Sequence, residues 1–347
     1  MRFWLGLYGM QSPRTHPRSL PWLYEETIRH AVEAERLGFD GFALTEHHFW
    51  YDGYCPALLP VLAAIARRTE MIRLLPFALL LPLRDPLRVA EEIAVVDHLS
   101  RGRLTLGLGY GYRAEEFQGF GLEKSRVPAR YFEIVEILRR AFGDGPLSFA
   151  GEYYSYEDVE IHPKPFQPGG PPLCLAGGSR EATARRAGRL GMDYCIAGTM
   201  LPVSSVQALI DTYRTAADQA NVPPGQIVVA IDVAIADTQD EVERIVAEDL
   251  RPVFAEQLAA FGFLRDAEGR SLTEVGPDHP VWTPLLNSFV LGSPDEVIAR
   301  IESFRDLGCD VFLARIMEAN LRSDRILREA RLFAERVIPH FREGAGR

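Results

Sequence analysis

The sequence predicts an α/β protein, specifically a (β/α)8 TIM barrel with insertions at its rim. Short apolar segments alternate with amphipathic helical segments along most of the 347 residues. The segment Leu74–Leu83 is almost entirely apolar, as expected for a strand covered on both faces of a parallel sheet. Barrels of this kind often reach this length as one unit, so residues 1–347 are expected to form a single domain.

Eight segments are expected to form the barrel strands, because each is short and apolar and the helical patterns lie between them. In chain order they are Phe3–Tyr8, Gly41–Leu44, Leu74–Leu83, Leu104–Leu108, Leu173–Ala176, Asp193–Ala197, Ile227–Ala234 and Asp310–Arg315.

Amphipathic helices are expected between these strands. In Leu23–Leu37 the apolar residues share one side, and Gly38 provides the stop that a helix end often requires. Ser293, Pro294 and Glu296 form a capping box that starts another helix. The remaining helices are expected at Pro56–Arg68, Val89–Leu99, Ile134–Ala141, and about 180–190, 203–220, 239–258 and 323–337.

Two stretches interrupt the alternation and are expected to be insertions at the rim of the barrel. Residues 148–170 contain several Tyr, Pro and Gly residues and predict a hairpin followed by a loop. Residues 259–290 predict a second insertion.

A doubly wound sheet is the rival architecture, and it normally has a glycine fingerprint after its first strand. Only Gly9 is found there. The run Gly107-x-Gly109-x-Gly111 follows the fourth strand instead, and it leads into Arg113-Ala114-Glu115, which does not read as a clear helix. The run is therefore a weak dinucleotide motif.

Composition excludes several classes of partner. The formal net charge of -10 argues against nucleic acid and against an anionic membrane surface, because both require a cationic footprint. No run of about 18 apolar residues is present, and the apolar stretch at the N-terminus is too short for a signal peptide. Four cysteines form no CxxC pair and are expected to be reduced core residues of a cytoplasmic protein: Cys55, Cys174, Cys195 and Cys309.

Two adjacent histidines, His47 and His48, stand at the end of the second expected strand. Active sites of these barrels lie at the carboxyl ends of the strands. Neighbouring side chains on an extended backbone point to opposite faces, so only one imidazole can face the pocket. A metal site and a buried histidine pair are the alternatives, and a histidine that acts on a ligand as acid, base or anion clamp is favoured.

Two further features predict ligand contacts. The sequence Gly177-Gly178-Ser179-Arg180 precedes an expected helix. Free backbone N–H groups at the helix start, together with the arginine, could bind an anion. A tight turn in which Ser179 caps the helix explains the same residues equally well. Pro76 lies inside an expected strand and lacks the N–H that the ladder needs. A distortion is therefore expected near Phe77-Ala78.

The chain resembles the bacterial luciferase-like flavin monooxygenases. The resemblance rests on five motifs that occur in the order and spacing of that family: Thr45–Phe49, Leu80–Pro86, Asp97–Arg103, Gly107–Gly111 and Phe117–Gly121. The Gly177–Ser179 loop and the last helix extend the match. It implies a barrel that holds FMN at the carboxyl ends of its strands, with His47 as the catalytic histidine.

The resemblance also implies the cofactor-binding residues. A cis peptide that packs against the flavin ring falls on Phe77-Ala78, and the phosphate loop falls on Gly177, Gly178, Ser179 and Arg180. Glu46, Gly109 and Tyr110 complete the implied set; luciferases proper have cysteine and arginine at the last two positions. Apolar Leu44, Phe77 and Leu108 are expected to exclude water from the site.

The implied function is that of a two-component monooxygenase. A separate flavin reductase would supply reduced FMN transiently, and an oxygen atom from O2 would enter a small apolar or aromatic substrate. The alternatives are a deazaflavin-dependent oxidoreductase of the same superfamily and a flavin-binding protein without catalysis. A homodimer is expected by analogy, with no metal site.

Overall fold

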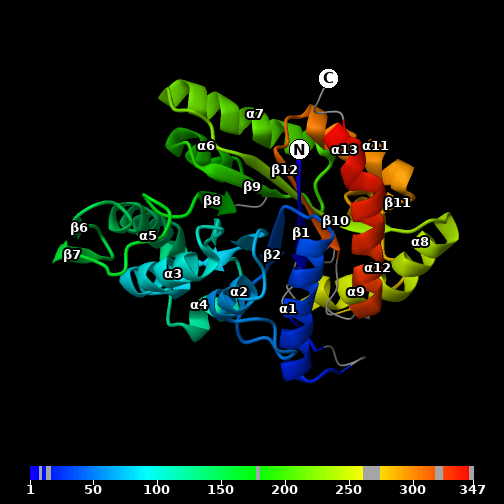
Figure 1. Cartoon of the computed structure of the whole chain (residues 1–347), viewed down its shortest axis with the longest axis horizontal. Helices are drawn as coiled ribbons and strands as arrows, with labels where there is room; N and C mark the ends of the chain where they lie inside the picture. Colours follow the sequence, from blue (N-terminus) through cyan, green and yellow to red (C-terminus); the bar gives the residue numbers. More distant parts are fainter. Residues whose placement is uncertain (8–9, 13–16, 177–179, 261–273, 317–322, 344–347) are drawn as a thin grey trace.

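A ring of parallel strands forms the centre of the molecule, and helices surround it (Figure 1). The computed structural model describes residues 1–7, 10–12, 17–176, 180–260, 274–316 and 323–343. The strands are β1 (Arg2–Leu7), β2 (Gly41–Leu44), β3 (Arg73–Pro76), β4 (Leu79–Leu80), β5 (Leu106–Gly109), β8 (Leu173–Ala176), β9 (Asp193–Ala197), β10 (Ile227–Ile235) and β12 (Val311–Ile316).

The strands neighbour one another in the order β3-β2-β1-β12-β10-β9-β8-β5-β4. Leu74 of β3 pairs in parallel with Leu104, just before β5, which closes the ring. The N–H of Leu74 donates to Arg103 O and the N–H of Thr105 donates to Leu74 O, both at 3.0 Å. Because β3 and β4 are two parts of one interrupted strand, the ring corresponds to the predicted TIM barrel.

The helices around the ring agree closely with the predicted ranges. The predicted capping box at Ser293 and Glu296 is present, and Gly38 after the first helix has a φ of 86°. None of the described helices combines the length and apolarity needed to cross a membrane. The helices are α1 (Leu20–Arg36), α2 (Leu58–Ala66), α3 (Pro86–Ser100), α5 (Val127–Ala141), α6 (Glu181–Leu190), α7 (Val203–Ala220), α8 (Gln239–Ile245), α9 (Arg251–Ala260), α11 (Pro294–Asp306), α12 (Ser323–Leu332) and α13 (Ile338–Glu343).

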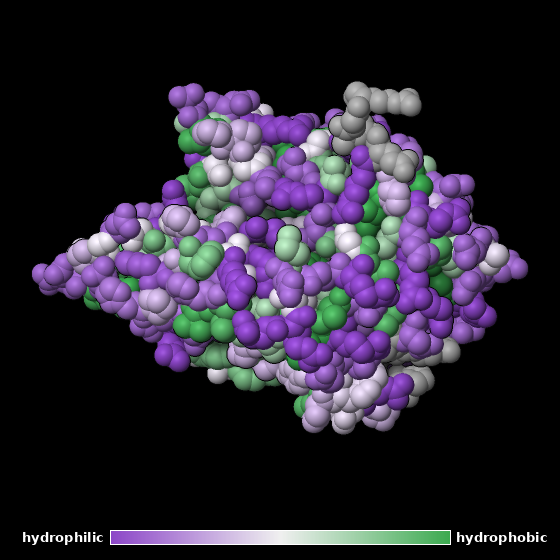
Figure 2. All heavy atoms as spheres, in the orientation of Figure 1, coloured by the Kyte–Doolittle hydropathy of each residue, from purple (hydrophilic) through white to green (hydrophobic). Residues whose placement is uncertain are grey.

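Apolar side chains form two separate layers on either side of the strands. One cluster fills the barrel interior and includes Ala43, Val228 and Leu313. Another lies between strands and helices and includes Phe42 and Leu44, the neighbours of Ala43. Side chains therefore alternate between the two layers along each strand. On the outer face seen in Figure 2, hydrophilic side chains surround small groups of hydrophobic ones.

All four cysteines are buried and free, as predicted. Cys174 and Cys195 belong to the barrel interior, and Cys55 and Cys309 belong to the layer between strands and helices.

The predicted rim hairpin is present. Strands β6 (Leu147–Ala150) and β7 (Ser155–Val159) pair antiparallel and project at the left of Figure 1. In the second predicted insertion, residues 261–273 lie outside the described part, whereas helix α10 (Trp282–Asn287) is followed by strand β11 (Val290–Gly292), which pairs in parallel with β10.

Two local predictions were wrong. Residues after Gly111 were not expected to form a clear helix, but Ala114–Gly119 forms the short helix α4. The single strand predicted over Leu74–Leu83 breaks after Pro76, resumes as β4 and ends in a 3-10 turn over Leu81–Leu83. The break itself confirms the distortion predicted near Phe77-Ala78, where the peptide bond is cis.

The glycines of β5 allow this strand to approach the break closely. A Cβ atom on Gly107 would lie 2.3 Å from the carbonyl oxygen of Pro76. A Cβ atom on Gly109 would lie 2.9 Å from the Cβ of Ala78. The Gly107-x-Gly109 run therefore serves the packing of two strands, since any side chain there would separate them.

Replacing Gly107 by alanine is expected to destabilise the barrel, because the new methyl group would collide with backbone that cannot move aside. We expect Gly107→Ala to lower the free energy of unfolding by about 1–3 kcal/mol, measured by urea denaturation. Gly276→Ala is the control, because a Cβ there meets no atom within 4 Å. Equal stability of the two variants would contradict this account of the strand packing.

Candidate active site

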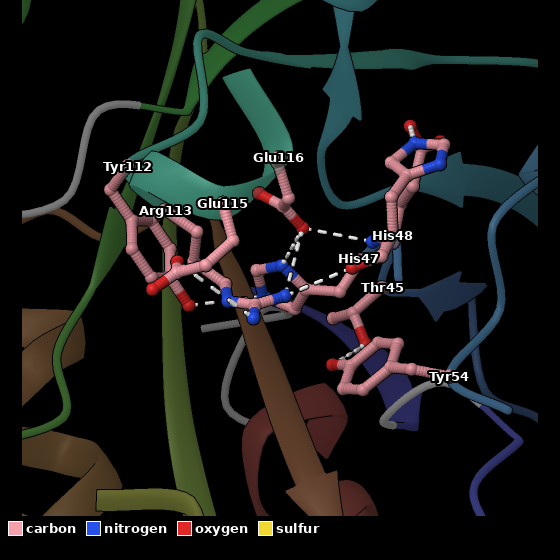
Figure 3. Close-up of polar contacts among 9 residues, drawn as sticks. Thr45, His47, His48, Tyr54, Tyr112, Arg113, Glu115 and Glu116 are labelled. Atoms are coloured by element: carbon pink, nitrogen blue, oxygen red, sulfur yellow. Dashed lines mark hydrogen bonds and ion pairs between the residues drawn. The ribbon is translucent and has the colours of Figure 1, made fainter. Parts of the chain in front are cut away.

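His47 lies in the loop after β2 with its imidazole held from both sides (Figure 3). Its Nδ1 is 2.8 Å from Oε1 of Glu116, and its Nε2 is 3.0 Å from the hydroxyl of Tyr112. The ring of Tyr54 packs edge-on at a centroid distance of 4.9 Å. The residue is only 7% exposed, so these contacts fix the orientation of its ring.

Glu116 comes from α4, and its side chain is fully buried. Its Oε1 also accepts the backbone N–H of His48 at 2.8 Å and lies 3.5 Å from Nη1 of Arg113. Burial alone would raise the pKa of Glu116, but the hydrogen bond and charge of His47, the backbone hydrogen bond from His48 and the charge of Arg113 outweigh it. The pKa is therefore below its ordinary value, and the carboxyl group is ionised at neutral pH.

The ionised Glu116 determines which nitrogen of His47 carries a proton. A carboxylate can only accept hydrogen bonds, so Nδ1 of His47 must be the donor. Although the Tyr112 side chain is 41% exposed as a whole, burial of its hydroxyl raises the pKa well above the ordinary value. The hydroxyl thus keeps its proton and can donate a hydrogen bond to Nε2 of His47 whenever that nitrogen carries no proton.

Arg113 links the loop after β5, to which it belongs, to the loop after β2. Its Nη1 donates to the carbonyl oxygen of His48 at 3.0 Å, and its guanidinium lies 4.3 Å from the ring centre of Trp50. The preceding turn contains Gly111 with a φ of 75°, which allows Tyr112 to reach His47. The loop after β5 is thereby fastened to the loop after β2.

Glu46 and His48 form a separate group. The imidazole of His48 points away from that of His47 (Figure 3). Oε1 of Glu46 is 3.1 Å from Nε2 of His48, and its Oε2 accepts from Nη2 of Arg84 at 2.9 Å. The two imidazoles thus point in opposite directions, as predicted. Both carboxylate oxygens of Glu46 have protein partners, and its cofactor-binding role stays a prediction.

The floor beside this site is apolar. Phe77 is 8% exposed and belongs to the barrel-interior cluster, and its N–H donates to Leu44 O at 2.7 Å. The cis peptide implied by the resemblance is present between Phe77 and Ala78, and Gly109 lies against Ala78. Leu44 and Leu108 were expected in the same wall, which was wrong. Both side chains belong to the outer layer, because each occupies the alternate position on its strand.

A charged group joins Asp232 within β10 to Arg315 near the end of β12 and to Thr199, which follows β9. Oδ2 of Asp232 is 2.5 Å from Nη2 of Arg315 and accepts from Thr199 Oγ1 at 2.6 Å, and Arg315 also contacts Thr199. Asp232 and Arg315 follow Ala230 and Leu313 of the barrel interior by two positions, so they face inward. The charge of Arg315 also acts on the hydroxyl of Tyr112 and opposes the rise of its pKa.

Of the predicted phosphate loop Gly177–Arg180, only Arg180 is among the residues that the structure describes. Gly177, Gly178 and Ser179 lie outside the described residues. Arg180 precedes α6, and its guanidinium lies 5.6 Å from the ring centre of Tyr110. The hydroxyl of Tyr110 is 3.1 Å from Oγ1 of buried Thr183. Arg180 and Tyr110, both of which the resemblance implies for cofactor binding, therefore lie together.

Several residues of this site were missed by the sequence analysis: Tyr112, Arg113, Glu116, Asp232 and Arg315. Two signals were available. Asp232 and Arg315 are charged residues within segments that are otherwise apolar, which is typical of a buried pair at a strand end. Two acidic residues in the first turn of a short helix, Glu115 and Glu116, are favoured by the helix dipole.

This arrangement can exchange a proton with a bound molecule. An imidazole whose Nδ1–H is held by a carboxylate leaves Nε2 as the nitrogen that can accept a proton from a bound molecule or donate one to it. Within the described residues, no group of three or more His, Cys, Asp or Glu side chains is placed to hold a metal ion.

Comparisons with known proteins give a consistent family. A family model described as luciferase-like monooxygenase matches residues 1–310. The FMNH(2)-dependent dimethylsulfone monooxygenase of Pseudomonas fluorescens is 26% identical over 337 residues, 93% of this chain and 88% of that protein. The F420-dependent glucose-6-phosphate dehydrogenase of Segniliparus rotundus is 28% identical over 293 residues, 82% of this chain and 85% of that protein.

The fold comparison agrees. The crystal structure of monooxygenase RslO1 from Streptomyces bottropensis matches with a TM-score of 0.85 and 27% identity, covering 98% of this chain and 100% of that one. Two uncharacterized proteins of Sinorhizobium fredii, y4wF and y4vJ, are 38% and 31% identical, but the chain spans only 55% and 50% of their lengths.

Removing the charge of Glu116 is expected to destabilise the protein in a pH-dependent way. Because its pKa is lowered in the folded state, the carboxylate contributes stability above its unfolded pKa of about 4.3. That contribution is lost as the pH falls through the lower folded value. We expect Glu116→Gln to cost about 1–3 kcal/mol at pH 7, with the difference from wild type shrinking below about pH 4.3.

The measurement is denaturant unfolding of both proteins from pH 7 to about pH 3.5, which spans the ordinary glutamate pKa. Glu115→Gln is the matched control, because it removes the same charge from a side chain that is 70% exposed. A pH-independent loss in Glu116→Gln would show that the carboxylate is not ionised in the native site.

Proposed function

Because the chain belongs to the luciferase-like monooxygenase family, we propose that it is an FMN-dependent monooxygenase. It would receive reduced flavin from a separate reductase and insert one oxygen atom of O2 into a small apolar or aromatic organic molecule. The observation that carries this proposal is His47, oriented by Glu116 and Tyr112 beside the apolar floor of the barrel mouth.

The residues at the mouth fit a flavin. A planar ring system needs a flat apolar surface, and Phe77, Ala78 and the side-chain-free Gly109 supply one. A phosphate needs donors and positive charge, and Arg180, Tyr110 and Thr183 lie together at the start of α6. These residues would hold FMN with the loop Gly177-Gly178-Ser179, while Glu46 would act by fixing the loop that carries His47.

Bound FMN in its reduced form would supply the electrons that activate O2. His47 would hold or move a proton at Nε2, the nitrogen that faces Tyr112. Glu116 would keep Nδ1 protonated and stabilise the imidazolium when Nε2 takes up a proton. Phe77 and the apolar interior below it would exclude water, which otherwise diverts activated oxygen to hydrogen peroxide.

A deazaflavin-dependent oxidoreductase is the second candidate, because three of the curated relatives are described as F420-dependent. Substrate turnover under anaerobic conditions with the reduced deazaflavin would favour it over the monooxygenase. Tight flavin binding without substrate-dependent oxygen uptake would instead favour a non-catalytic flavin-binding protein. The cytoplasmic location, the transient contact with a reductase and the homodimer are parts of the proposal.

The direct test combines the protein with a flavin reductase, NADH, FMN and air, and screens apolar and aromatic compounds for stimulated oxygen consumption. A compound that is oxygenated in step with the oxygen consumed would support the proposed function. No binding of FMN in either redox state, measured by calorimetry, would refute it.

Removing the imidazole of His47 is expected to uncouple the reaction while leaving the flavin site intact. We expect His47→Ala to bind FMN like wild type but to form product about 10²–10⁴-fold more slowly, the range typical of general acid–base residues. Oxygen consumed would then appear as hydrogen peroxide. His48→Ala is the control, because its imidazole points away from Tyr112 toward Glu46. Full coupling in His47→Ala would rule out the proton-handling role.

A further inference from the structure

A cavity of about 350 Å³ between α5, α6 and the residue that follows β5 is lined by four arginines. Arg180 immediately precedes α6, and the other three arginines belong to it: Arg185, Arg186 and Arg189. Tyr110, which follows β5, and Phe132 of α5 also line the cavity. We call this the arginine pocket. It adjoins the predicted phosphate position, because Arg180 and Tyr110 belong to both.

The arginine pocket has excess positive charge. Arg185 lies 3.7 Å from Glu181, and both side chains are exposed. Within the described part of the chain, Arg180, Arg186 and Arg189 form no ion pair with a carboxylate. Aromatic faces hold two of the guanidinium groups, at 5.6 Å for Arg180 over Tyr110 and 4.5 Å for Arg186 over Phe132. These contacts direct the cations without neutralising them.

This local charge opposes that of the whole chain, which is -10. A phosphate monoester carries a charge of about -1.5 to -2 at neutral pH, so the molecule as a whole repels it. Screening limits each charge to a range of about 8 Å at physiological ionic strength, and within that range the four arginines dominate. A cationic cavity of this kind can raise association rates by about 10–10³-fold.

We propose that the arginine pocket captures the phosphate of reduced FMN from solution before the flavin ring enters the barrel mouth. The inference rests on the proposed function, since a flavin delivered by a separate reductase must bind anew in every catalytic cycle. Arg186 and Arg189 act on the rate of capture, whereas Arg180 and Tyr110 lie where the pocket meets the final phosphate position.

The test is the association rate of reduced FMN in anaerobic stopped flow, followed by quenching of protein fluorescence. We expect the double variant Arg186→Gln/Arg189→Gln to bind reduced FMN about tenfold more slowly than wild type at low salt. The dissociation rate constant should change less, and the difference should narrow in about 0.5 M salt because the charges are screened. Reduced riboflavin, which lacks the phosphate, should bind both proteins at the same rate.

The matched control is Arg331→Gln/Arg336→Gln, which removes the same two charges from exposed positions at the end of α12 and just after it. Equal slowing in this control would assign the effect to net charge and overturn the proposal. Slower binding of riboflavin by the pocket variant would overturn it as well, because the change would then be structural. If wild type binds FMN at a rate that does not depend on salt, the capture role is refuted but the proposed function is not. If wild type does not bind FMN at all, both are refuted.

Discussion

Alternation of side chains along the strands of a closed barrel is the constraint on which the site depends. Each strand has one side toward the interior and one toward the helices. The register of a strand therefore determines which of its residues face the interior. Ala230 and Leu313 face inward, and two positions later the same parity brings Asp232 and Arg315 to the mouth. Leu44 and Leu108 have the opposite parity and pack against helices. A polar mouth above an apolar interior is the direct result.

The sequence was sufficient to predict most of the barrel because the strands are short apolar runs with clear boundaries. The ranges of β2, β8 and β9 agree with the expected segments, and α7 agrees with its expected range. The break after Pro76 was also predictable, since proline has no N–H to donate to a neighbour within a central strand. The 3-10 turn that follows was not, because a continuous apolar run reads equally well as strand.

The site was less predictable, since its key contacts join residues that are far apart in sequence. Glu116 is 69 residues from His47, and Arg315 is 83 residues from Asp232. The acidic pair Glu115 and Glu116 in the first turn of α4 indicates a helix start but not a buried carboxylate, because a helix of six residues shows no helical period. His47 was found because paired histidines at a strand end are distinctive. The roles of Gly177, Gly178 and Ser179 stay predictions.

One oxygen atom of Glu116 accepts from the His47 ring and the His48 backbone, while Tyr112, four residues earlier, reaches the other ring nitrogen. Both groups that flank the imidazole therefore belong to a single short segment of chain. If this segment were exchanged between relatives, Tyr112 and Glu116 would be exchanged together. Both hydrogen-bond partners of the histidine ring would therefore change at once. Diversification of proton chemistry within this architecture could then proceed by recombining one turn while the strands stay unchanged.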